Sequence, residues 1–393
     1  MKKIVKAVLF LIILIISGIL VFEHSYKLTS DDFITEKTTF IYSNKNINQE
    51  KLKKLEKIFN VDIIAQKEIL KKVKSISFLS QSKIYSSDIN IVGIADTGIY
   101  YPFIYMNLYK YFDEKENFFY ELKDEYKTEL ELSNIDKVYL KAYRGLFFIG
   151  IDTITIDKII NSKDKRSIKV VEILENQKDN GLGTFILNQE RERLFGIDRV
   201  VVSGDIKDNK IIFDSFIYGD NEIIKDLSVQ PNERLMPKYI SNNKLYISTA
   251  NINKLDTFIL RAISYKMNTS KKTNLIQELF IRGFVDIISK LNGEIVIDTK
   301  NGNYLLGLKS SKNIEFFTKY FENNGNISIE KDIEGNTYIC IGNNTFAPAE
   351  ENKIIENNQF LSGIIDIDYG KVEINGFYDS DKLRIKTQIN TDK

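Results

Sequence analysis

The chain has 393 residues, of which 43% are hydrophobic and 28% charged, and its formal net charge is +1. This balance is typical of a globular protein with two or three domains, and the near-zero charge argues against a bulk electrostatic field that recruits nucleic acid. With one Cys and one His, the chain cannot form an internal disulfide or a Cys/His zinc site, and a His-dependent catalytic centre could use only His24.

The N-terminus predicts a membrane anchor. Residues 4–22 are apolar or small apart from Lys6, and a helix of roughly 20 such residues crosses a bilayer. Lys2 and Lys3 precede this run, so the positive-inside rule leaves the N-terminus in the cytoplasm and the bulk of the chain outside it. We therefore expect a single-pass protein of the cell (inner) membrane, periplasmic in bulk if an outer membrane is present. A cleaved signal peptide is the alternative.

Two stretches far apart in the chain follow the same pattern of a short strand, a polar turn and an amphipathic helix. They are "TTFIYSNKNINQEKLKKLEKIF" from Thr38 and "NNKLYISTANINKLDTFIL" from Asn242. Each is followed by a second predicted helix, at 65–79 and 273–291, and then by a strand, at 89–96 and 293–299. Asn301-Gly302 predicts a two-residue hairpin turn after the later strand.

The correspondence continues in the same order to the end of each half. A polar helix ends in "YKYFDE" (109–114) and in "TKYFEN" (318–323), and strand pairs follow at 138–151 and 327–342. The segments 182–188 and 361–367 also match, and the closing hairpins 200–219 and 371–390 align without a gap. The predicted fold class is α+β, a tandem duplication of a strand-helix-helix plus antiparallel-sheet unit, preceded by one N-terminal transmembrane helix.

The expected domains follow from this repeat. Residues 1–30 form the cytoplasmic tip and transmembrane signal anchor, and 31–228 form the first extracytoplasmic repeat. Residues 229–242 form a linker with two of the four prolines, and 243–393 form the second repeat.

Apolar side chains are in surplus in the first repeat. "KLRIKTQIN" (382–390) alternates cleanly between apolar and polar residues, as a half-exposed strand does, whereas "KIIFDSFIY" (210–218) is apolar on both faces. "IYYPFIYMNLYKYF" (99–112) is rich in aromatic residues, which suit interfaces and ligand mouths. We take as the candidate apolar binding surface the residues Tyr101, Phe103, Tyr105, Phe216 and Tyr218.

No catalytic, cofactor-binding or metal-binding residues are predicted. Two acidic pairs, Asp152 with Asp157 and Asp366 with Asp368, could hydrolyse a glycoside, but 54 acidic residues produce such pairs by chance. Cys340 lies in the apolar alternation "YICIG", so we expect a buried small hydrophobe.

At this point the sequence resembles a bacterial family of exported proteins classed as a domain of unknown function. The resemblance rests on Leu245–Leu255, Gly145–Ile160, Leu182–Asn188, Val200–Gly219 and the "PKYI" lead-in from Pro237. It implies an exported protein with an N-terminal anchor and duplicated α+β repeats, and it brings no catalytic residues.

The functional prediction is a membrane-anchored extracytoplasmic protein without enzymatic activity that binds or scaffolds in the cell envelope. Its expected partners are the membrane through residues 4–22 and a lipid or envelope protein, with no nucleic acid and no cofactor. The alternative is an acid-pair hydrolase that acts on envelope glycan.

Overall fold

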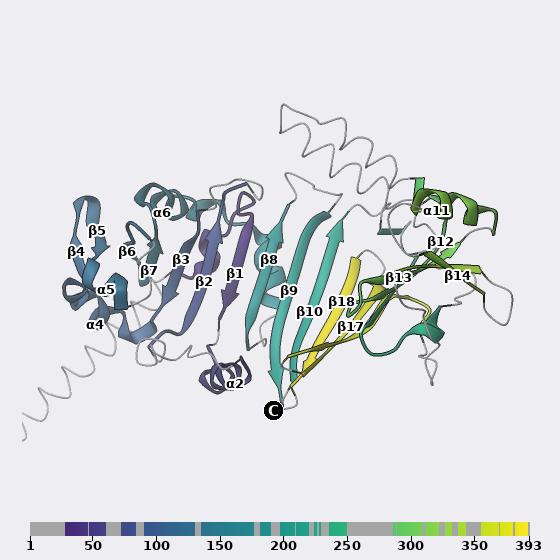
Figure 1. Ribbon diagram of the computed structural model, residues 1–393. Helices are drawn as coiled ribbons and strands as arrows, with labels where there is room; N and C mark the ends of the chain where they lie inside the picture. Colours follow the sequence, from purple (N-terminus) through teal and green to yellow (C-terminus); the bar gives the residue numbers. More distant parts are fainter. Residues whose placement is uncertain are drawn as a thin grey trace, which may run out of the picture. The chain divides into compact units, whose positions relative to one another are not determined.

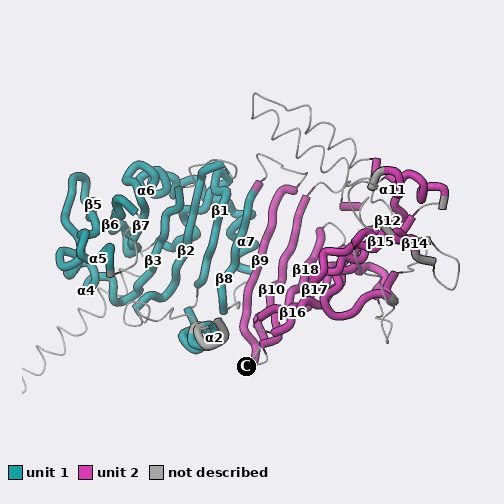
Figure 2. Tube along the Cα trace, in the orientation of Figure 1, with its two compact units in different colours: residues 1–188 teal, residues 189–393 magenta. Residues whose placement is uncertain are grey.

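The computed structural model divides into two compact units, residues 1–188 and 189–393, which are described one at a time (Figure 2). It describes residues 28–45, 47–59, 72–83, 90–129, 135–176, 181–189, 197–208, 210–219, 236–249, 289–308, 311–321, 327–331, 337–342, 355–368, 370–379, 382–391 and a few single positions between these ranges. The unit boundary places the hairpin 200–219 with the C-terminal half of the chain.

The first unit is built on antiparallel strands in the spatial order β8-β1-β2-β3-β7-β6-β5-β4 (Figure 1). The bounds are β1 Phe40–Asn44, β2 Ser75–Ser80, β3 Val92–Asp96, β4 Phe112–Glu114, β5 Phe119–Leu122, β6 Tyr139–Tyr143, β7 Leu146–Gly150 and β8 Gly183–Asn188.

The second unit contains the order β14-β15-β13-β12-β11-β16-β17-β18-β10-β9, again antiparallel throughout. The bounds are β9 Ile197–Lys207, β10 Lys210–Gly219, β11 Lys244–Ser248, β12 Leu291–Asp298, β13 Asn303–Leu308, β14 Ile327–Lys331, β15 Thr337–Ile341, β16 Gln359–Ile367, β17 Gly370–Asp379 and β18 Lys382–Asn390.

Helices are few and short among the described residues. The α-helices are α2 Gln49–Phe59, α4 Tyr101–Met106, α5 Asp124–Glu129, α6 Thr153–Ile160, α7 Ile168–Asn176 and α11 Ile314–Phe321. The 3-10 turns are η2 Ser30–Phe33, η4 Gly98–Tyr100, η5 Leu108–Lys110, η6 Glu116–Phe118, η7 Lys163–Lys165, η9 Pro237–Tyr239 and η10 Ser311–Asn313. The polar turn before α2 provides its N-cap. The Asn48 side-chain oxygen accepts hydrogen bonds from the backbone N–H groups of Glu50 and Lys51.

The predicted fold class is wrong. In place of α+β repeats of a strand-helix-helix plus antiparallel-sheet unit behind a transmembrane helix, the described residues form eighteen antiparallel strands with few helices. Part of the error lies at 65–79, which we expected to be helical, because its last residues begin β2. "SISFLS" places Phe78 and Leu79 on opposite faces of a strand that pairs with β1 and β3, while residues 65–71 of the predicted helix lie outside the described ranges.

The same strand order occurs within each unit. The order β8-β1-β2-β3-β7-β6 in the first unit matches β16-β11-β12-β13-β15-β14 in the second. This match corrects one correspondence drawn from the sequence, which set residues 89–96 (β3) against 293–299 (β12). In the strand order, β3 corresponds to β13, and β2 corresponds to β12. Residues 112–114, expected to end a helix, form β4, and the second unit has no equivalent of the β4–β5 hairpin among its described strands.

The predicted membrane anchor, residues 4–22, lies outside the described residues. Among the residues that the structure does describe, no helix is both long enough and apolar enough to cross a bilayer. The structure therefore gives no support to the transmembrane signal anchor or to the single-pass inner-membrane location derived from it, and we withdraw both predictions.

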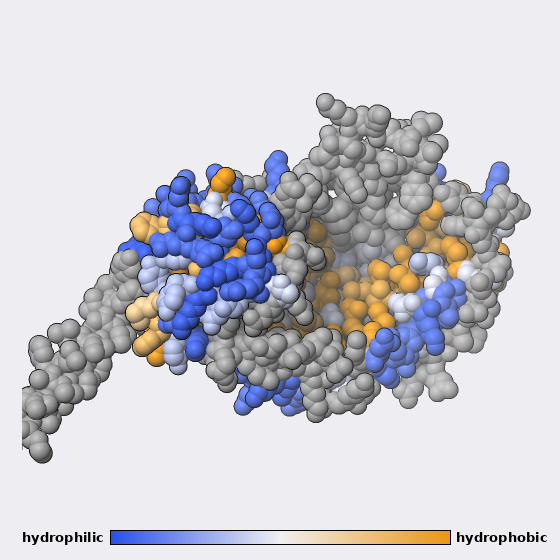
Figure 3. All heavy atoms as spheres, turned by 60° about the vertical axis from the view of Figure 1, so that its left-hand side comes forward, coloured by the Kyte–Doolittle hydropathy of each residue, from blue (hydrophilic) through white to orange (hydrophobic). Residues whose placement is uncertain are grey.

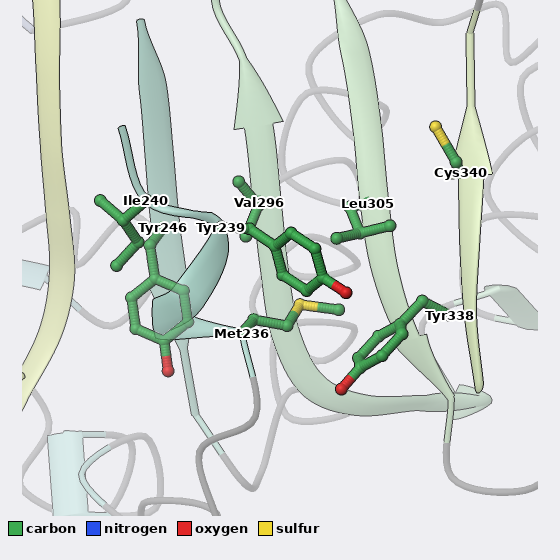
Figure 4. Packing of buried hydrophobic residues seen from close by; sticks show 8 residues of the cluster. All are labelled: Met236, Tyr239, Ile240, Tyr246, Val296, Leu305, Tyr338 and Cys340. Atoms are coloured by element: carbon green, nitrogen blue, oxygen red, sulfur yellow. The ribbon is translucent and has the colours of Figure 1, made fainter. Parts of the chain in front are cut away.

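A buried core of the second unit includes residues from the stretch that the sequence suggested was a linker. Met236, Tyr239 and Ile240 pack with side chains from β11, β12, β13 and β15 (Figure 4). The ring of Tyr239 lies edge-on to that of Tyr338, with centroids 5.8 Å apart. Cys340 is buried in the same cluster, as predicted. Nothing else bears on the predicted domain boundaries, which stay a prediction.

The hairpin between β12 and β13 is confirmed, but its turn is longer than predicted. Asp298 pairs with Asn303, which leaves a four-residue loop, and only Gly302 of that loop has a positive φ (68°). The buried Asp298 side chain accepts from the backbone N–H groups of Lys300 (3.0 Å) and Asn301 (2.9 Å), and it pairs with Lys244. Burial alone would raise the pKa of Asp298, but these hydrogen bonds and the Lys244 charge outweigh it and lower the pKa to about 2.

Asp298 is therefore expected to stabilise the second unit in a pH-dependent way. Its folded-state pKa is below its ordinary value, so its contribution is complete above that ordinary value and is lost as the pH falls toward about 2. Asp298→Asn should lower the free energy of unfolding by about 2 kcal/mol near neutral pH, and the loss should shrink in acid. Urea titrations at neutral and acidic pH measure this. Asp379→Asn, an exposed ion-pair partner of Lys382, is the control and should change stability by under about 0.5 kcal/mol. A pH-independent loss for Asp298→Asn would contradict the assignment.

Candidate functional site

Five adjacent strands of the second unit, β16-β17-β18-β10-β9, have one face that carries no charged side chain along β16, β17, β18, β10 and residues 200–207 of β9. Directly opposed residues of antiparallel strands share a face, so the registers fix its composition. Phe213 lies opposite Gly204 and Thr387, and Ile385 lies opposite Ser215 and Gly376. The apolar members are Val200, Val202, Ile206, Ile211, Phe213, Ile217, Leu383, Ile385, Ile389, Val372, Ile374, Tyr378, Leu361, Ile365 and Ile367. We call this set the apolar sheet face.

The apolar sheet face is only partly buried. Ile206 and Ile211 are buried, but most of its other apolar side chains, Phe213, Ile385 and Ile374 among them, keep part of their surface accessible. Hydrophobic side chains gather in a continuous patch on the second unit (Figure 3). Because isolated apolar residues are common on protein surfaces but broad charge-free faces are not, this face is the strongest candidate for a binding surface in the described part of the chain.

The opposite face of the same strands is polar and carries two of the predicted site residues. Phe216 and Tyr218 point to this side from β10, and the Lys382 ammonium lies 5.2 Å from the Phe216 ring centroid and 5.7 Å from that of Tyr218. Arg384 lies 5.3 Å from the Phe216 centroid and donates two hydrogen bonds to Asp214, one of them 2.8 Å long. These rings are thus covered by cations that are themselves paired, which favours a structural role.

The other three predicted site residues lie in the first unit, on α4. Tyr101 and Tyr105 are stacked with centroids 6.1 Å apart, and Tyr101 also contacts Phe147 at 4.8 Å. Phe103 points outward and is 65% exposed. The hydroxyls of Tyr120 and Tyr105 are 3.5 Å apart, and their hydrogen bond raises the pKa of Tyr120. The five predicted residues therefore fall into two separate groups, three in one unit and two in the other.

The acidic pairs considered from the sequence have structural roles. Asp152 is the N-cap of α6 and accepts from the Thr155 N–H at 2.7 Å, while Asp157 pairs with Lys141 at 2.8 Å. Asp366 accepts from the Asn243 amide, and Asp368 lies beyond the end of β16 in an exposed turn. Within the described ranges, no group of three or more His, Cys, Asp or Glu side chains could hold a metal ion.

The sequence pattern revealed the two apolar rows of the apolar sheet face, but not that they lie side by side. The alternation of 382–390 and the row Ile211, Phe213 and Ile217 were both evident from spacing. What spacing could not show is that β10 pairs with β18, so that the two rows join into one surface. The arrangement defines an antiparallel β-protein with a one-sided apolar face and polar residues on its reverse side.

Comparisons with known proteins do not narrow this class. No family model and no curated protein matches the chain, so the resemblance to an exported family stays a prediction. Among solved structures, the chain is similar to crystal form IV of TP0453, with a TM-score of 0.33 and 7% identity over 50% of this chain and 82% of that one. For crystal form I of TP0453, the TM-score is 0.31 and the identity 8%, over 54% of this chain and 82% of that one. Similarity at this level carries no functional argument.

Proposed function

We propose that the protein is a non-catalytic binding protein that holds a lipid on the apolar sheet face. The observation that carries this proposal is that the set of residues defined as the apolar sheet face includes no charged side chain, while most of its apolar side chains remain partly accessible. Covering such side chains stabilises a complex by about 25 cal/mol per Å² of apolar surface removed from water.

The chemistry of the face favours an acyl chain over a polar ligand. Its polar side-chain groups are the hydroxyls of Ser215 and Thr387, near the middle of the β10–β18 pair, and that of Tyr378 on β17. A ligand with several hydrogen-bonding groups would lose its water contacts on this face without recovering them, at a cost of about 1–3 kcal/mol for each group. A long apolar chain has no such groups to desolvate. Charged headgroups would remain at the rim of the face, in contact with water.

Two neighbouring residues of β10 provide a matched test, because Phe213 belongs to the apolar sheet face and Ile212 to its reverse. In native mass spectrometry of the full chain, purified in mild detergent from its producing cells, we expect a bound lipid mass on the wild type and on Ile212→Asp. Phe213→Asp should reduce lipid occupancy at least about tenfold, since a carboxylate against an acyl chain costs more than about 1.4 kcal/mol. Ser215→Asp places a charge on the same face without deleting an apolar side chain and should act in the same direction.

Circular dichroism of each variant establishes that it is folded before its lipid occupancy is compared. Equal lipid occupancy in the wild type, Phe213→Asp and Ser215→Asp would mean that the lipid binds elsewhere on the protein. A wild type that carries no lipid would remove the proposal and favour a scaffolding role with a protein partner, which chemical cross-linking would then detect.

A further inference from the structure

An uncharged segment of the first unit lies on its surface. Residues 97–109, "TGIYYPFIYMNLY", contain no acidic or basic side chain, although 28% of the whole chain is charged. The segment forms η4, α4 and the start of η5, and all of its residues are described. No charged residue interrupts this segment, although most of its large side chains are exposed to solvent. We therefore asked what these apolar side chains could contact.

The segment is amphipathic in the sense that one side packs on the sheet. Tyr101, Ile104 and Leu108 pack on the core residues Leu140 and Phe147. The remaining large side chains point away from the core, and four of them are mostly exposed: Ile99 at 59%, Phe103 at 65%, Met106 at 61% and Tyr109 at 67%. We call Ile99, Tyr100, Phe103, Tyr105, Met106 and Tyr109 the aromatic ridge.

The aromatic ridge is held in place by specific contacts. Pro102 lies in the first turn of α4, and the Tyr101–Tyr105 stack and the Tyr101–Phe147 contact fix the helix on the sheet. The Asn107 side chain donates to the Phe103 carbonyl at 2.7 Å. The Lys123 ammonium donates to the carbonyls of Tyr109 (3.0 Å) and Lys110 (3.1 Å), where the helical segment ends. The fold therefore satisfies these backbone carbonyls internally while it presents the apolar side chains outward.

We infer that the aromatic ridge docks on the interfacial region of a lipid bilayer. Three properties support this partner. The ridge is uncharged, which is complementary to a zwitterionic interface and offers no ion pair to a protein surface. Its carbonyls near the ridge already accept hydrogen bonds, whereas a protein–protein interface normally adds about one hydrogen bond per 100–200 Å². Its exposed tyrosines Tyr100 and Tyr109 each combine an apolar ring with a polar hydroxyl, which is the combination enriched at membrane–water boundaries.

Other exposed apolar residues of the same unit lack these properties. Ile154 on α6 is 79% exposed, and Ile168 is 70% exposed beside Lys169. Both are isolated rather than part of an uncharged segment, which is the ordinary condition of surface hydrophobes. They provide matched controls, because they are as exposed as the ridge but are not expected to enter a bilayer. The inference does not depend on lipid binding to the apolar sheet face, which lies in the other unit.

The chain has no Trp, so a single introduced Trp reports on one position only. We would add dioleoylphosphatidylcholine vesicles to the full chain carrying either Phe103→Trp or Ile154→Trp. For Phe103→Trp we expect a shift of the emission to shorter wavelength and a loss of intensity when brominated acyl chains are included. For Ile154→Trp we expect neither change. Adding Met106→Asp to Phe103→Trp should abolish both effects, because a carboxylate is expelled from the interface.

The emission of the introduced Trp distinguishes docking through the aromatic ridge from membrane association through any other part of the chain. If the protein floats with vesicles while the Phe103→Trp emission stays unchanged, or if both Trp positions respond equally, the aromatic ridge is not the docking surface. Absence of vesicle binding altogether would also overturn the inference. The proposed function is tested separately, by the bound lipid mass that depends on Phe213 and is measured without vesicles. Either proposal can therefore be contradicted while the other is supported.

Discussion

Replacing Tyr239 by alanine is expected to lower the free energy of unfolding of the second unit by about 3–5 kcal/mol. The Tyr239 side chain is buried with Met236 and Ile240 in the core formed by β11, β12, β13 and β15, and its ring contacts Tyr338 edge-on. Alanine removes the apolar ring surface and leaves a cavity that rigid strands on several sides cannot close. A small domain is stable by only about 5–15 kcal/mol, so this loss is a large part of the total.

The measurement is equilibrium urea unfolding followed by circular dichroism, with Ser241→Ala as the matched control. Ser241 is exposed two residues further along, and its replacement should change stability by less than about 0.5 kcal/mol. A Tyr239→Ala variant as stable as Ser241→Ala would mean that residues 236–240 behave as a connecting segment, as Pro237 and their position in the predicted linker suggested.

Some local structure was predictable from the sequence because short-range patterns determine it. The strand and helix at 40–59, the two closing hairpins and the burial of Cys340 are all found in the structure. In each case the signal is local: an alternation with period two, a polar turn followed by helical spacing, or a turn of two residues.

The fold class and the membrane anchor were not obtained correctly, for reasons that differ. "SISFLS" follows a lysine-rich segment with helical spacing, and only pairing with strands distant in the sequence reveals it as β2. Helical spacing at 318–323 was carried over to 109–114, where Phe112–Glu114 instead pairs with β5. The predicted anchor rested on the hydropathy of residues 4–22 and on the lysines near its start; these residues lie outside the described ranges, and none of the described helices is long and apolar enough to cross a bilayer.

The apolar sheet face depends on the pairing of β10 with β18, which the alignment of the two repeats did not indicate. The closing hairpins align without a gap, which places Asp214 against Ile385 and Ser215 against Lys386 in the alignment. In the structure, Asp214 pairs with Lys386 and Ser215 with Ile385. Equivalent strands thus meet antiparallel about a local twofold axis between these residues. Because both strands carry apolar residues at alternate positions with matching phase, this register puts both rows on one side and creates the apolar sheet face.

Ile385→Pro is therefore expected to disrupt both the β10–β18 junction and lipid binding. β18 pairs with β10 on one side and β17 on the other, so Ile385 has no solvent-facing strand edge. Proline removes a ladder donor, leaves an acceptor unpaired and clashes with the preceding residue, which together cost about 3 kcal/mol or more. Ile385→Val removes one methylene and should cost about 1 kcal/mol while it keeps the ladder.

Amide hydrogen exchange locates the effect. In Ile385→Pro we expect loss of protection in β10 and β17, which do not carry the substitution, and in Ile385→Val we expect protection to persist. If β10 amides remain protected in Ile385→Pro, the strand is held mainly by β9, and the apolar sheet face does not depend on the junction. If protection is lost in both strands and the bound lipid mass disappears with it, then the register between β10 and β18 assembles the binding face as well as joining the two hairpins.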